Sequence, residues 1–159
     1  LPTVGFWISE ENKAYFSNRL TKKDSLTQSP FFKAMQAKDS QLFFAKAENI
    51  QEVATIYAMP KRVAVIANQH TGSSAETFVY RCRQSSRVIT FGQNTAGIVD
   101  GFNGNVIDYA CFSLRYPTSV RTPNIATEAI DPIGMYPDVY LSEDMEDPVA
   151  FIVELLNSM

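Results

Sequence analysis

The hydrophobic and polar positions of the chain follow two clear rhythms in its middle part. Residues 62–68 form a continuous apolar run of strand length, which predicts a strand buried on both faces. Residues 74–82 have the i, i+3, i+4, i+7 apolar spacing of a helix, and residues 87–91 predict the next strand. Strand, helix and strand in this order predict a right-handed parallel crossover. The apolar helix positions are Ala75, Phe78, Val79 and Cys82.

The pattern that follows is more broken. Asn103-Gly104 is a hairpin-turn signal between two apolar pairs, and Pro117 is expected to end the strand after it. Asp147-Pro148 predict the N-cap and the first-turn proline of a C-terminal helix. Shorter patterns predict a helix at 30–38 and strands at 41–45, 109–116 and 138–141.

Together these elements predict an α/β fold with a mixed, mostly parallel sheet and some antiparallel pairing at its edge. The first sixty residues are polar, aromatic-rich and weakly periodic, and we expect their aromatic rings to be packing residues rather than a ligand cage. The chain is therefore divided into a segment 1–60, which packs on or leads into the core, and a regularly patterned region 61–159.

Composition narrows the function classes. The 159 residues suffice for one domain with its own core. The net charge is −3, from 14 Lys and Arg against 17 Asp and Glu, and the sequence has no basic cluster, which argues against a nucleic-acid partner. No apolar run approaches the ~18 residues of a membrane-spanning helix. Two cysteines and one histidine are too few for a structural zinc site. Cys82 and Cys111 lie in apolar periodic segments, which favours buried free thiols over a disulfide between them.

The segment 71–76, T-G-S-S-A-E, places Ser73 where the buried strand meets the helix. Open α/β sheets bind ligands at the carboxyl ends of their strands, and the free N–H groups of a helix's first turn can stabilise an oxyanion there. Glu76 lies three residues after Ser73, as in a capping box, so a plain helix cap has the same pattern. This segment alone leaves both chemistry and capping open.

Two further segments follow in order. Residues 92–97 are G-Q-N-T-A-G, and residues 133–139 are I-G-M-Y-P-D-V, with Glu128 before them. Together with 71–76, they resemble the catalytic core of the C-terminal processing (tail-specific) serine peptidases and their tricorn-type relatives. Order and spacing match from the first predicted core strand onward, whereas the first sixty residues add no readable motif.

This resemblance implies a ClpP/crotonase-like fold of stacked strand-strand-helix units, and a serine endopeptidase that acts on polypeptide without a metal or organic cofactor. It places the nucleophile on Ser73. Ser74 is the alternative nucleophile, or else the donor of a backbone N–H to the oxyanion hole. Glu128 matches the Glu that assists the His base of the tricorn-type branch. The lysine of the Ser–Lys branch would fall on Ile98, which accepts no proton, so that mechanism is excluded at this position.

The general base is the missing part of this site. His70, the one histidine, lies three residues before Ser73, but the family pattern requires no histidine there. The family's upstream His segment and glycine-rich stretch do not precede Ser73, and the chain starts at Leu1 without a signal-peptide pattern. We therefore expect 61–159 to be the C-terminal part of a catalytic domain, in a fragment that is inactive or weak by itself. The resemblance favours the cell envelope or the outside of the cell, although tricorn-type enzymes are cytosolic; the oligomeric state is not indicated.

Two other functions stay open. A non-catalytic module that binds a ligand or a protein on the same fold would explain the missing base. An unrelated α/β domain, in which Ser73 only caps a helix, would explain the turn; Ser73→Ala would then change stability by roughly 1 kcal/mol and nothing else. The acidic residues Asp144, Glu146 and Asp147 favour capping of the last helix over calcium binding.

Overall fold

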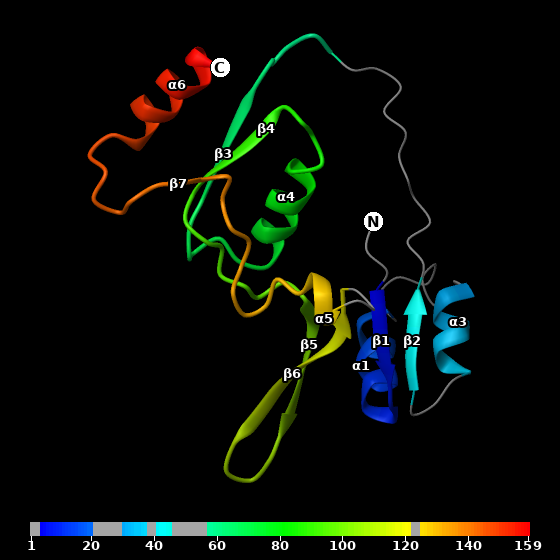
Figure 1. Cartoon of the computed structure of the whole chain (residues 1–159). Coiled ribbons are helices and arrows are strands. Elements are labelled where there is room, and N and C mark those ends of the chain that lie inside the picture. The colour runs from blue at the N-terminus through cyan, green and yellow to red at the C-terminus, as the bar shows by residue number, and fades with distance from the viewer. Residues whose placement is uncertain (1–3, 21–29, 38–40, 46–56, 122–124) are drawn as a thin grey trace. The chain divides into compact units, whose positions relative to one another are not determined.

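The computed structural model describes residues 4–20, 30–37, 41–45, 57–121 and 125–159. The chain folds into two compact units, whose elements are labelled in Figure 1. Unit 1 consists of Leu1–Gln51 and Asp100–Glu128, and unit 2 of Glu52–Val99 and Ala129–Met159. The division after residue 60 stays a prediction. No helix in the described ranges is long and apolar enough to cross a membrane.

The described part of unit 1 contains four strands and three helices. The strands are β1 (Val4–Ile8), β2 (Gln41–Ala45), β5 (Gly101–Asp108) and β6 (Ser113–Val120), and the helices are α1 (Glu10–Leu20), α3 (Pro30–Gln36) and α5 (Ile125–Glu128). The strands pair antiparallel in the order β2-β1-β6-β5. Ile8 and Met35 are fully buried between sheet and helices, and Phe6 packs edge to face on Phe16 at 5.6 Å. These aromatic rings are packing residues, as predicted.

The hairpin of unit 1 turns later than the sequence predicts. Asn103 has a positive φ of 56° but stays inside β5, where its amide donates to the Ser119 hydroxyl at 2.9 Å. The chain reverses between Tyr109 and Phe112, whose rings stack at 4.8 Å. Pro117 lies within β6 instead of ending it, because β1 pairs with β6 only beyond this residue and the missing N–H breaks no ladder on that side.

Unit 2 contains the predicted parallel crossover. Its elements are β3 (Val63–Ala67), α4 (Ser74–Cys82), β4 (Val88–Gly92), β7 (Val139–Tyr140) and α6 (Pro148–Ser158). The strands form a parallel sheet in the order β3-β4-β7, with Val65 opposite Thr90. The predicted cap of α6 is confirmed, since the Asp147 carboxylate accepts from the Ala150 N–H at 2.9 Å.

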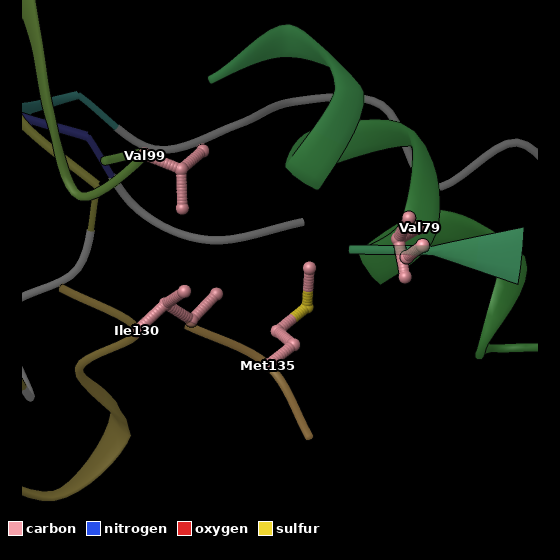
Figure 2. Close-up of a cluster of buried hydrophobic side chains, with 5 residues drawn as sticks. Val79, Val99, Ile130 and Met135 are labelled. Carbon is pink, nitrogen blue, oxygen red and sulfur yellow. The ribbon is translucent and has the colours of Figure 1, made fainter. Parts of the chain in front are cut away.

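Two apolar clusters stabilise unit 2. The first joins α4 and β3 to the segments that come directly before and after residues 100–128 of unit 1, and Figure 2 shows its side chains, four of them labelled. It consists of Ala67, Val79, Val99, Ile130 and Met135. The second packs α6 on the sheet through Phe91, Leu141 and Ile152.

Three expectations need correction. Two separate sheets, one antiparallel and one parallel, take the place of a single mostly parallel sheet. The strand β3 is not buried on both faces, because the side chain of Ile66 is 55% exposed. It is also an edge strand in the part of the chain that the structure describes. Cys82 and Cys111 are free thiols, but Cys82 is half-buried and Cys111 is exposed, since it lies in the hairpin turn.

Candidate active site

Ser73 lies at the junction of β3 and α4, where the sequence places the candidate nucleophile. It is exposed, and it is the N-cap of α4. Its backbone has φ 54° and ψ −113°, a conformation that residues other than glycine rarely adopt and that costs about 1–3 kcal/mol. A strained serine between a strand and a helix is the arrangement of the nucleophile elbow in α/β-hydrolases, where it exposes the hydroxyl at the end of the strand.

A buried carboxylate holds this turn. Glu76 is completely buried, and both of its oxygens accept hydrogen bonds. Oε2 accepts from the Ser73 N–H at 2.9 Å and from the Ile98 N–H at 3.0 Å. Oε1 accepts from the Gly97 N–H at 2.7 Å and from the Thr95 hydroxyl at 2.6 Å. One carboxylate therefore joins the turn of Ser73 to the loop that follows β4.

The same contacts determine the charge of Glu76. Burial alone would raise the pKa of Glu76, but the hydrogen bonds from Thr95, Ile98, Gly97 and Ser73 outweigh burial and hold the pKa below its usual value. Glu76 is therefore a carboxylate at neutral pH. The predicted capping box with Ser73 is present, and in it the Ser73 N–H donates to Glu76 Oε2 at 2.9 Å.

The loop after β4 is also held from its other side. The Thr95 hydroxyl accepts from the Met135 N–H at 2.8 Å, and the Thr95 N–H donates to the Met135 carbonyl at 3.2 Å. Gly134 has φ +82°, and a Cβ there would lie 2.1 Å from the Thr95 carbonyl oxygen. Only glycine fits at this position, so the segment before β7 can approach the loop closely.

Asp138 attaches the last segment to the sheet. Its Oδ2 accepts from the Thr90 N–H at 2.8 Å and from the Thr90 hydroxyl at 2.7 Å, and its Oδ1 accepts from Arg83 Nη2 at 3.2 Å. Burial opposes ionisation of Asp138, but the Thr90 hydrogen bonds and the Arg83 charge lower its pKa below the usual value. The Pro-Asp pair, which alone indicates only a turn, therefore connects β7 to β4.

Glu128, the predicted assistant of the base, lies in unit 1 as the last residue of α5 and is exposed. Its backbone carbonyl accepts from Arg121 Nη2 at 3.2 Å, and Arg121 Nε pairs with the buried Asp100 carboxylate at 2.8 Å. Ser73 belongs to unit 2. Because the positions of the two units relative to one another are not determined (Figure 1), the pairing of Glu128 with Ser73 stays a prediction.

The other predicted residues lie around the turn of Ser73. Ser74 is exposed as the first residue of α4, where backbone N–H groups have no partner within the helix. Ile98 packs beside the turn, because a Cβ on Gly72 would lie 2.8 Å from the Ile98 Cδ1. His70 is exposed in the turn after β3. Among the residues that the structure describes, no group of three or more His, Cys, Asp or Glu could hold a metal ion.

Sequence analysis missed three residues that build the site: Glu76 as more than a cap, Thr95 and Asp138. A usable signal was present, since each is a polar residue of a short segment that carries the family resemblance. Two of them, Glu76 and Thr95, are buried, and a buried polar side chain needs hydrogen-bond partners.

The model of peptidase family S41 matches residues 4–141. The chain belongs to peptidase family S41. This confirms the resemblance to the C-terminal processing peptidases, and it shows a peptidase-family domain. The family match begins in β1, so it includes residues 4–60, in which no motif was readable.

Solved structures similar to this S41 chain come from several proteins. A putative peptidase from Parabacteroides merdae is 18% identical, with 75% of this chain and 37% of that chain covered and a TM-score of 0.48. A lipoprotein from Streptococcus agalactiae is 24% identical, with 61% and 32% covered and a TM-score of 0.41. A photosystem II D1 C-terminal processing protease is 25% identical, with 64% and 24% covered and a TM-score of 0.38. The chain thus spans well under half the length of each. No curated protein matches the chain.

Proposed function

We propose that this chain carries the nucleophile of a serine endopeptidase of family S41, with polypeptide as the substrate. Ser73 attacks the scissile carbonyl, and backbone N–H groups at the start of α4, that of Ser74 among them, stabilise the oxyanion. The leaving amine takes the proton that the base removed from Ser73, and water then hydrolyses the acyl-enzyme. Glu128 orients the base. The proposal includes a ClpP/crotonase-like catalytic domain, of which residues 61–159 form the C-terminal part.

We further infer that the base comes from chain outside the described residues. Among the described residues, no acid, imidazole or amine is hydrogen-bonded to the Ser73 hydroxyl. A serine hydroxyl is a weak nucleophile without such a partner. In this proposal the 159-residue chain is a fragment, and alone it is inactive or weak.

The backbone of Ser73 is the observation that carries the proposal. An N-cap serine ordinarily has a β-region backbone and accepts a hydrogen bond with its hydroxyl. Ser73 instead has a backbone φ of 54°. Four hydrogen bonds to the buried Glu76 stabilise the site around this strained residue. A helix cap needs no strained backbone, whereas a strained turn between a strand and a helix exposes the nucleophile in a nucleophile elbow.

Labelling with a fluorophosphonate probe, read by intact mass, tests the proposal, because such probes react with activated serines. The samples are this chain, a longer natural chain that contains it, and Ser73→Ala and Ser74→Ala variants of both. We expect labelling of the longer chain that Ser73→Ala abolishes and Ser74→Ala preserves. Labelling that Ser74→Ala abolishes instead would move the nucleophile to Ser74. No labelling of any sample would refute the active peptidase and leave the binding module.

A further inference from the structure

A cavity of about 360 Å³ opens at the carboxyl ends of the three strands of unit 2. Ala67 and Gly92, the last residues of β3 and β4, line it, together with Leu141, which follows β7. Parallel α/β sheets place their ligands at this edge. His70 also lines the cavity, and the turn after β3 leads from it directly to Ser73. The cavity therefore lies beside the segment that carries the candidate nucleophile.

Part of the cavity wall is apolar. Leu141 is buried, Met145 and Pro148 are half-buried, and Ile66 lines the cavity although 55% of its surface is exposed. Apolar side chains that stay exposed inside a concavity gain stability when an alkyl chain covers them. The volume lies within the range of about 300–1,000 Å³ that small-ligand sites occupy.

The charge of the cavity has one sign. Glu143 is the one carboxylate among the described lining residues, and those residues include no lysine or arginine. Its Oε1 accepts from Gln69 Nε2 at 3.3 Å, so it lies over the turn after β3. Asp144 and Glu146 are exposed in the same segment. An anionic side chain would be repelled here, and a cation would be attracted.

We propose that this cavity binds a lysine or arginine side chain of the polypeptide substrate. The methylene groups of that side chain pack on Ile66 and Met145, and its cationic end reaches Glu143 at the mouth. An apolar wall with a charged mouth suits these two side chains, because each combines a long alkyl stem with a charged head. That the bound side chain belongs to a substrate rests on the proposed peptidase function.

Fluorescence anisotropy of labelled, blocked short peptides tests this binding without any turnover. The protein is the 159-residue chain with Ser73→Ala, and the peptides differ only in one central residue, which is Lys, Arg, norleucine or Glu. We expect the Lys and Arg peptides to bind about three- to tenfold more tightly than the norleucine peptide, with the Glu peptide weakest. Added salt should reduce this preference.

Glu143→Gln should bring the Lys and Arg peptides to the affinity of the norleucine peptide. The matched control is Glu154→Gln, an exposed carboxylate on α6 that does not line the cavity, and it should leave the preference intact. Equal binding of the Lys and norleucine peptides, a preference that survives Glu143→Gln, or no binding of any peptide at millimolar concentration would overturn the inference. Because the readout is binding, a failure of fluorophosphonate labelling would refute the peptidase and leave this result unaffected.

Discussion

The carboxylate of Glu76 lies 2.6 Å from the hydroxyl of Thr95, and this buried hydrogen bond joins the turn of Ser73 to the loop after β4. The Thr95 hydroxyl also accepts from the Met135 N–H at 2.8 Å. The three segments that carry the family resemblance therefore meet at one pair of side chains. Glu76 and Thr95 therefore hold these segments together, whichever chemistry Ser73 performs.

Glu76→Gln is expected to lower the free energy of unfolding by about 3 kcal/mol. Glutamine has one acceptor oxygen, so its NH₂ group would face backbone N–H donors that now reach a carboxylate oxygen. Urea unfolding measures the change. Glu154→Gln, on the exposed side of α6, is the control and should change stability by no more than about 0.5 kcal/mol. A Glu76→Gln variant as stable as the unsubstituted chain would contradict the inference that this carboxylate stabilises the fold.

Stability should fall in acid, because Glu76 and Asp138 have lowered pKa values in the folded chain. Such groups contribute stability that is fully present above their unfolded pKa values, about 4 for these residues, and that is lost as the pH falls through the folded values. We expect the urea midpoint to be steady between about pH 7 and 5 and to fall below about pH 4. Glu76→Gln should make this fall of the midpoint smaller. An equally steep fall in that variant would show that other titrating groups cause the loss of stability in acid.

Ser73→Gly is expected to be more stable than Ser73→Ala by about 1 kcal/mol. Glycine adopts φ 54° without a Cβ clash, whereas alanine keeps the Cβ, and both variants lack the hydroxyl. Thermal or urea unfolding of the two variants side by side measures the difference. Equal stability would show that Ser73 is not strained in solution, which would remove the main support for the nucleophile.

Ile98→Lys is expected to raise the rate of fluorophosphonate labelling of this chain at least about tenfold. Position 98 packs beside Gly72, and the Ile98 N–H already donates to Glu76, so an amine there would lie close to the turn of Ser73. Ile98→Met is the control of similar size without a base, and Ser73→Ala in the Ile98→Lys background shows which serine reacts. Unchanged labelling would mean that this position does not reach the Ser73 hydroxyl.

Local patterns predicted the elements that depend on local contacts. The 3.6-residue spacing predicted α4, and Asp147 before Pro148 predicted the start of α6, because helix caps and helical faces involve residues a few positions apart. The predicted position of the hairpin turn was wrong because of a contact between two strands. Asn103-Gly104 has the composition of a turn, but Ser119 on the neighbouring strand satisfies the Asn103 amide and keeps it within β5.

By itself, the sequence determined the family, the parallel crossover and the position of Ser73 between a strand and a helix, because short motifs and local periodicity carry these features. Only the tertiary structure decided that Glu76 is buried and accepts from Ser73, Thr95, Gly97 and Ile98. It also decided that β3 is an edge strand among the described residues and that Glu143 lies over a cavity beside His70. These features depend on which residues far apart along the chain come together, since burial and hydrogen-bond partners arise from packing between segments.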